Sequence, residues 1–202
     1  MEEFSLVYID GTPDTILGRY LDGLNTIYAE KGYIIKYSEI LFKSEDDYNS
    51  LLKDERVQTA NILIIDSMLF ENKTAKDGKF TGEEFKFVLQ KFYPFIEVIV
   101  ISQNDLEPGI TMISKYVKNP LETGREYYAR IIPPSIDAAI NSILQYRILA
   151  KKMSDNESWE TVLKEKVLGT LHGTQAYDEL TKEDIDILIR AFKEIKEKIN
   201  AG

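Results

Sequence analysis

Short, unbroken hydrophobic runs recur along the chain, and each ends at a polar or acidic residue. The clearest is residues 62–65, three isoleucines and a leucine that lead directly into Asp66. A run without polar alternation is typical of a strand buried on both faces, as in the middle of a parallel sheet. The runs at 6–9 and 98–101 follow the same pattern and lead into Asp10 and Ser102. We therefore expect three buried strands that bring polar side chains to one edge of a sheet.

Between these runs, apolar residues recur at helical spacing behind polar start signals. Three pairs of residues are expected to mark helix starts: Thr12 with Pro13, Ser44 with Asp47, and Thr81 with Glu84. The sequence predicts strands at 4–9, 33–37, 61–65, 97–101 and 127–132, helices that begin at Thr12, Ser44, Thr81 and Pro133, and a further helix near 109–118.

Five alternations of strand and helix predict an α/β fold, a five-stranded parallel sheet with helices on both faces, over residues 1–150. The rest of the chain differs. Apolar positions around Trp159 and along 185–199 have helical spacing, and no strand pattern follows. We expect residues 151–202 to form an α-helical appendage whose helices pack on the sheet domain, on each other, or on a second copy of the chain in a homodimer.

Composition and charge exclude several classes of protein. The chain has 202 residues and a net charge of −9, which argues against a nucleic-acid partner because such binding depends on clustered cations. It contains no cysteine, so disulfides and thiolate metal sites are excluded. No apolar run is long enough to span a membrane, and the Met-Glu-Glu start lacks the basic region of a signal peptide. We expect a cytoplasmic protein.

The residues that follow the strands are candidates for chemistry. Parallel strands release the chain at the carboxyl edge of the sheet, where open α/β folds bind their ligands. Asp10, Asp66 and Ser102 should meet at this edge, and buried carboxylates gathered at one place indicate a cation, phosphate chemistry or both. The alternative is that these residues only end strands and cap the following helices.

This arrangement resembles the receiver domain of bacterial response regulators, which has a flavodoxin-like fold. The resemblance covers roughly residues 3–150. It rests on an acid after the first strand (Asp10), an acid after the third (Asp66), a serine after the fourth (Ser102) and a proline after the fifth (Pro133). Asp66-Ser67-Met68, followed by Thr81-Gly82 at the next helix start, adds to it.

The resemblance implies roles for these residues. Asp66 would be the phospho-acceptor, its carboxylate attacking the phosphorus of a donor. Asp10, Asp66 and the backbone carbonyl of Met68 would hold Mg²⁺, and Ser102 would hydrogen-bond a phosphoryl oxygen. The chain would then be a two-component signalling module rather than an enzyme with a separate substrate. Its partners would be a sensor kinase or an output protein.

Three departures from the family pattern favour an alternative. Gly11 stands where the family has a second acid, and Asp14 is the nearest replacement. Ile132 stands where the family has a lysine before the proline, so Arg130, Lys115, Lys118 or a lysine in 71–79 would have to substitute. The aromatic switch position of the family falls near Ala129, beside Tyr128. The alternative is a pseudo-receiver, a protein-interaction module that works without phosphorylation.

Other enzyme classes fit less well. Asp10-Gly11-Thr12 is similar to the first motif of haloacid-dehalogenase-like phosphatases, but their nucleophile position falls on Tyr8, which cannot serve. The chain has neither a P-loop nor a dinucleotide-binding glycine fingerprint. Its single histidine, His172, is expected at a helix end and leaves no basis for a catalytic triad.

Overall fold

The computed structural model describes residues 1–43, 45–69, 81–103, 112–115, 121–155 and 167–169. They form a five-stranded parallel sheet in the order β2-β1-β3-β4-β5, which is the order of flavodoxin-like folds. The predicted fold class is confirmed. The strands are β1 (Glu2–Asp10), β2 (Tyr33–Leu41), β3 (Ile62–Asp66), β4 (Glu97–Ser102) and β5 (Met112–Ser114).

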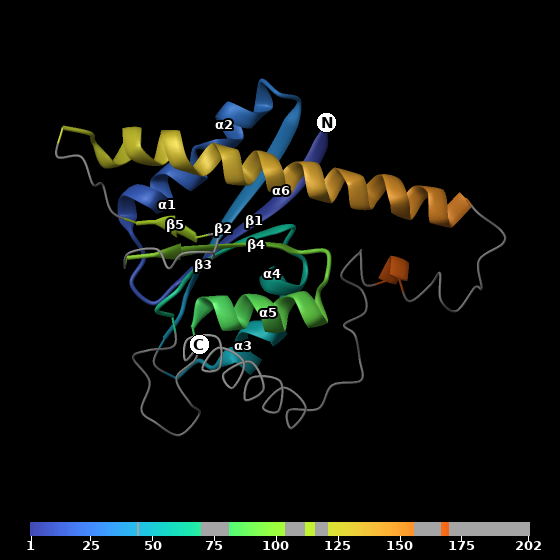
Figure 1. Ribbon diagram of the computed structural model, residues 1–202, viewed down its shortest axis with the longest axis horizontal. Coiled ribbons are helices and arrows are strands. Elements are labelled where there is room, and N and C mark those ends of the chain that lie inside the picture. Colours follow the sequence, from blue (N-terminus) through green and yellow to red (C-terminus); the bar gives the residue numbers. More distant parts are fainter. Residues whose placement is uncertain (44, 70–80, 104–111, 116–120, 156–166, 170–202) are drawn as a thin grey trace, which may run out of the picture.

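Helices cover both faces of the sheet (Figure 1). On one face lie α1 (Thr15–Asp22), α2 (Leu24–Ala29) and α6 (Gly124–Asp155); on the other lie α3 (Tyr48–Lys53), α4 (Glu55–Gln58) and α5 (Gly82–Phe92). The central strand β3 is buried along its whole length, because successive side chains point to opposite faces. Leu63 and Ile65 join the core under α5, whereas Ile62 and Ile64 join the core under α1 and α6.

Short polar side chains fix where the helices begin, with two corrections to the expected caps, one at α1 and one at α3, which starts after Asp47 and not at Ser44. Asp14, not Thr12, caps α1, because its carboxylate accepts hydrogen bonds from two backbone N–H groups of the first turn. Asp47 forms a capping box with Ser50 at α3. Thr81 and Glu84 form the expected capping box at α5. The last of these places α5 against the end of β3.

The prediction of a fifth strand at 127–132 was wrong. These residues lie inside α6, and β5 is instead Met112–Ser114, within the segment where a helix at 109–118 was expected. The buried residues Tyr128, Ile132, Ile136 and Ile140 recur every four positions and form one helical face. The β-branched and aromatic composition of 127–132 suggested a strand, but burial of this face decides in favour of a helix.

The expected helix start at Pro133 was also wrong, since α6 begins nine residues earlier and contains both Pro133 and Pro134. Each proline removes a backbone donor, which disfavours a helix interior. Packing on the sheet offsets this loss: Ile132, Ile136 and Ile140 are almost fully buried. The true start signal is a capping box in which Thr123 and Glu126 bond to each other's backbone N–H groups.

Several predictions fall on residues that the structure leaves undescribed, namely the lysines of 71–79, Trp159, His172 and the helix along 185–199. The expected boundary at residue 150 falls within α6, which continues to Asp155. Within the described residues, no helix is both long enough and apolar enough to cross a bilayer.

Candidate functional site

Strand register brings the predicted site residues to one edge of the sheet. Ile9 pairs with Ile65, so Asp10 and Asp66 leave neighbouring strands at the same level. Asp66 in turn pairs with Ile101, which puts Ser102 one residue further along the next strand. All three residues are buried, with at most 6% of their surface exposed. The structure therefore confirms that these residues gather at the carboxyl edge.

Lys115 joins this group and is the residue that connects it. It follows β5 directly, and its backbone N–H donates to the carbonyl of Ser102 at 2.7 Å, which extends the ladder between β4 and β5. Its ammonium forms a hydrogen-bonded ion pair with Oδ2 of Asp10 and lies 3.1 Å from Oδ1 of Asp66. The Lys115 side chain is only 3% exposed. One buried cation thus holds two buried carboxylates together.

Both oxygens of Asp10 are occupied by protein donors. Oδ1 accepts the Thr12 backbone N–H at 2.8 Å. Oδ2 accepts the Tyr8 hydroxyl at 2.5 Å in addition to Lys115. Tyr8 lies two residues earlier on β1, so its side chain points to the same face of the sheet as Asp10. Burial, followed by the hydrogen bond to Asp10, raises the pKa of the Tyr8 hydroxyl, which remains a proton donor at neutral pH.

Asp66 lies in a less satisfied environment. Burial raises the pKa of its carboxyl group, and the negative charge of Asp10 adds to this effect, while Lys115 acts in the opposite direction. Its Oδ1 contacts Lys115 at ion-pair distance but accepts no well-oriented hydrogen bond within the described structure. Two carboxylates face one ammonium here. The electrostatic strain is concentrated on the residue expected to accept a phosphoryl group.

Ser102 lies beside Ser67, the residue that follows Asp66. The Ser67 hydroxyl donates to the Ser102 hydroxyl at 3.1 Å. The start of α5 packs closely on the same turn, because a Cβ on Gly82 would lie 2.5 Å from the backbone oxygen of Asp66. Gly82 is therefore required for this approach, and its N–H donates to the Ser67 carbonyl at 2.9 Å. Two hydroxyl groups and a helix start thus surround the end of β3.

Asp14 does not replace the family's second acid. Its Oδ1 caps α1, and its Oδ2 lies 2.7 Å from the hydroxyl of Tyr128 on α6. Both oxygens are thus engaged away from Asp66.

The lysine expected before Pro133 is found at another place. Ile132 is a fully buried core residue of α6, so its comparison with the family lysine was wrong. Arg130 pairs with Glu122 at the surface, at 2.8 Å. Lys118 and the lysines of 71–79 lie outside the described residues. Of the two proposed substitutes that the structure describes, Lys115 reaches the site and Arg130 does not.

The site residues are compatible with a divalent cation held mainly by water. Within the described chain, no cluster of three or more acidic or histidine side chains is arranged around a common point. Mg²⁺, however, often binds through one or two carboxylates and retains several waters. Asp10 and Asp66 supply two such carboxylates, but the Lys115 ammonium holds the position on which both converge, so an ion bound there would have to displace it.

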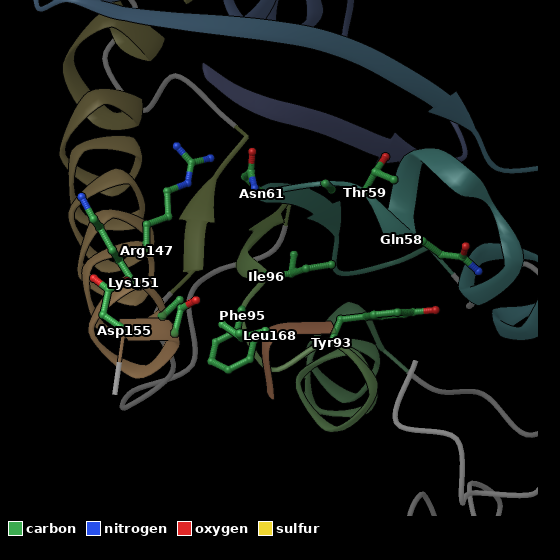
Figure 2. A pocket seen from close by; sticks show the side chains of 13 residues that line it. Gln58, Thr59, Asn61, Tyr93, Phe95, Ile96, Arg147, Lys151, Asp155 and Leu168 are labelled. Carbon is green, nitrogen blue, oxygen red and sulfur yellow. The ribbon is translucent and has the colours of Figure 1, made fainter. Parts of the chain in front are cut away.

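A second hollow lies at the opposite, amino-terminal edge of the sheet. It has a volume of about 540 Å³ and is lined by the segments that enter β3 and β4 and by the last turns of α6. In Figure 2, Arg147 and Lys151 of α6 lie across from Phe95 and Ile96. None of the residues that converge at the carboxyl edge lines this hollow. We therefore assign the candidate chemistry to the Asp66 site.

Comparisons with known protein families, curated proteins and solved structures found no match for this chain.

Proposed function

We propose that this chain is a receiver-like signalling module in which Asp66 accepts a phosphoryl group. The observation that carries the proposal is the convergence of Asp10, Asp66 and Lys115, with Ser102 beside them, at the carboxyl edge of a sheet with flavodoxin-like strand order. Lys115 supplies the cation that appeared to be missing at Ile132. The partners implied by this role are a sensor kinase or another phosphoryl donor and an output protein.

In the proposed step, an oxygen of the Asp66 carboxylate attacks the phosphorus of the donor. A new P–O bond forms to Asp66 while the bond to the donor's leaving group breaks, so acetyl phosphate would yield acetate and an acyl phosphate on Asp66. The transferred group carries negative charge on its peripheral oxygens. The Lys115 ammonium and the Ser102 hydroxyl are close enough to the end of β3 to donate to these oxygens.

Asp10, Asp66 and the Met68 carbonyl would hold Mg²⁺ if the module uses it. The ion would neutralise charge on the transferred group. The Lys115 ammonium already supplies one positive charge between the two carboxylates. We therefore expect weaker dependence on Mg²⁺ than for a site with three acids.

Incubation with acetyl phosphate and Mg²⁺, followed by intact-mass measurement, tests the proposal. A single phosphoryl adduct is expected on the wild-type chain and none on Asp66→Asn. Gly11→Asp, which restores the second acid of the family pattern, is expected to increase both the rate and the Mg²⁺ dependence. An adduct of equal yield on Asp66→Asn would exclude Asp66 as the acceptor.

One observation favours the second candidate function, a pseudo-receiver that binds a partner without phosphorylation. Asp10 is saturated by Thr12, Tyr8 and Lys115, which leaves the site closed and internally neutralised except for one charge. In such a module, the ion pairs of Lys115 with Asp10 and Asp66 would stabilise one conformation of the carboxyl edge of the sheet. Absence of an adduct under the conditions above, together with unchanged partner binding by Asp66→Asn, would support this alternative.

A further inference from the structure

Tyr128, on the second turn of α6, connects the helix to the Lys115 site. Its hydroxyl lies 2.8 Å from the backbone carbonyl of Lys115 and 2.7 Å from Oδ2 of Asp14. The side chain is 2% exposed, so these two acceptors provide the hydroxyl's polar environment without help from bulk solvent. The preceding residue, Tyr127, donates to the carbonyl of Ser114 at 2.9 Å. Two consecutive tyrosines of α6 thus form hydrogen bonds with backbone carbonyls at the end of β5.

The Tyr128 hydroxyl carries one proton, whereas both of its close neighbours are acceptors. It can donate to the Lys115 carbonyl or to the Asp14 carboxylate, but not fully to both. Burial and the neighbouring Asp14 raise the pKa of this hydroxyl, so the proton is retained. The arrangement therefore has two alternative hydrogen-bonded states, which share the same heavy-atom contacts.

Each of the two acceptors of the Tyr128 hydroxyl is connected to the charged site through its own contacts. Lys115 carries the ammonium that contacts Asp10 and Asp66. Asp14 caps α1, and its backbone N–H lies 3.3 Å from the Tyr8 hydroxyl, which in turn donates to Asp10. The contacts close a ring that runs through β1, α1, α6 and the end of β5. A change in the direction of the ammonium alters one side of this ring directly.

Within the described sheet, β5 has the fewest paired residues of the strands in the ring. Among the described residues, β5 is a three-residue strand at the edge of the sheet and pairs with β4 alone. Few ladder hydrogen bonds therefore oppose a small shift of Lys115, whereas β1 is paired on both sides. A shift of the Lys115 carbonyl changes which acceptor the Tyr128 hydroxyl prefers.

We propose that Tyr128 is a positioning residue for Lys115, and that its shared hydroxyl couples the charge state of the Asp10–Asp66–Lys115 site to the first turns of α6. Helix α6 is 32 residues long, and its last turns line the hollow at the opposite edge of the sheet (Figure 2). The helix is thus placed to carry a change at one edge to the other. The role of phosphorylation as the natural trigger rests on the proposed function, but the coupling itself does not.

Tyr20 provides a matched control for a test of this coupling. Its hydroxyl is buried without a hydrogen-bond partner in the described structure, and its ring packs near that of Tyr128, with centroids 6.4 Å apart. Tyr128→Phe and Tyr20→Phe therefore remove the same atom from the same core, but only the first breaks the ring of contacts.

The experiment measures hydrogen exchange of residues 121–135 in wild type, Tyr128→Phe and Tyr20→Phe, each with and without Lys115→Met. Peptides from α5 serve as a reference for global unfolding. In wild type and Tyr20→Phe, Lys115→Met should speed exchange in the first turns of α6 by about fivefold relative to α5, the equivalent of one ordinary hydrogen bond. In Tyr128→Phe this added effect should disappear.

An equal response to Lys115→Met in Tyr128→Phe would overturn the proposal, as would the absence of a response in wild type and Tyr20→Phe. Acetyl phosphate is then applied to the three proteins that retain Lys115. An adduct that changes α6 exchange in wild type but not in Tyr128→Phe supports the coupling with phosphorylation as its trigger. Absence of an adduct would contradict the proposed function, while the Lys115→Met comparison would still decide the coupling.

Discussion

Replacing Lys115 by methionine is the most informative single change at the site. The substitution keeps an unbranched side chain of similar reach but removes the ammonium. It would leave Asp10 and Asp66 facing each other in a buried place without a cation. We expect a large loss of stability at neutral pH, because uncompensated buried charge is among the most costly defects in a protein.

The structure allows a rough magnitude for this loss. At 3.1 Å and an effective dielectric constant of about 20, the attraction between the Lys115 ammonium and Asp66 is about 5 kcal/mol before desolvation is subtracted. Asp10 makes a second contact with the same ammonium. Measured losses on removal of one partner from a buried pair are about 3–5 kcal/mol. We expect the free energy of unfolding to fall by that amount.

Urea denaturation followed by far-UV circular dichroism measures this loss. Lys36→Met is the matched control: Lys36 pairs with Glu3 at 2.6 Å, but both side chains are more than half exposed, so the expected loss is below about 1 kcal/mol. The double variant Lys115→Met/Asp66→Asn retains only the Asp10 carboxylate, which keeps its Tyr8 and Thr12 donors. It should recover at least about 2 kcal/mol of the loss.

Two results would refute this reasoning. If Lys115→Met costs no more than Lys36→Met, the ammonium is not a buried counter-ion for the two carboxylates. If the double variant is as unstable as Lys115→Met alone, the loss comes from packing of the side chain rather than from charge.

Three further predictions concern neighbouring residues, and each is read from urea denaturation. Tyr8→Phe should lower the free energy of unfolding by about 1.5–3 kcal/mol, because it removes a buried hydroxyl that donates to the Asp10 carboxylate. Tyr20→Phe should change it little, because the Tyr20 hydroxyl has no hydrogen-bond partner among the described residues. Equal losses in the two variants would contradict the role of Tyr8 as a donor to Asp10. Burial raises the pKa of Asp66 in the folded protein above its ordinary value of 3.8, so folding favours the protonated carboxyl group. The contribution of this group to the free energy of unfolding is therefore greatest below pH 3.8 and is lost as the pH rises through the pKa of the folded protein. The stability of Asp66→Asn relative to wild type should therefore increase from pH 4 to pH 7, and a constant difference would refute the raised pKa. Gly82→Ala should lower the free energy of unfolding by about 1–3 kcal/mol, because the added Cβ would clash with the backbone oxygen of Asp66. Gly11→Ala should lower it much less, because a Cβ there would lie 3.6 Å from the backbone oxygen of Phe42, an ordinary contact.

The sequence was sufficient for most of the sheet because its buried strands are continuous apolar runs. Residues 62–65 have no polar interruption, and β3 is buried throughout. The same logic located Asp10, Asp66 and Ser102, since parallel strands of one sheet must end at one edge. Those features depend only on local composition and a general topological rule.

The fifth strand could not be located in this way. β5 has three residues, too few to show a period, and the connection between β4 and β5, residues 103–111, is shorter than the dozen or so residues typical of a parallel crossover. The tyrosine- and isoleucine-rich segment at 127–132 gave a stronger strand signal, and two prolines suggested a helix start after it. The signal that could have corrected this is Thr123-Gly-Arg-Glu126, a capping-box pattern just before the apolar face of α6.

The error in the fifth strand also left Lys115 as one of several candidate substitutes for the family lysine. Once β5 is placed at Met112–Ser114, the lysine directly after this strand, at the edge where Asp10 and Asp66 meet, is Lys115. Tyr8 could not be recognised as a partner of Asp10 from spacing alone, because an i, i+2 relation on a strand gives only a shared face. That contact depends on how the phenol ring packs under α1 and α6.

The measurement that tests the central claim most directly is the location of a phosphoryl group on the chain after incubation with acetyl phosphate and Mg²⁺. Borohydride reduction of the acyl phosphate and tandem mass spectrometry of the peptides would identify the modified residue. The account predicts one modified residue, Asp66, with a strongly reduced yield in Lys115→Met/Gly11→Asp, which restores the second acid but lacks the ammonium. Modification at another carboxylate, or no modification of wild type and Gly11→Asp alike, would contradict it.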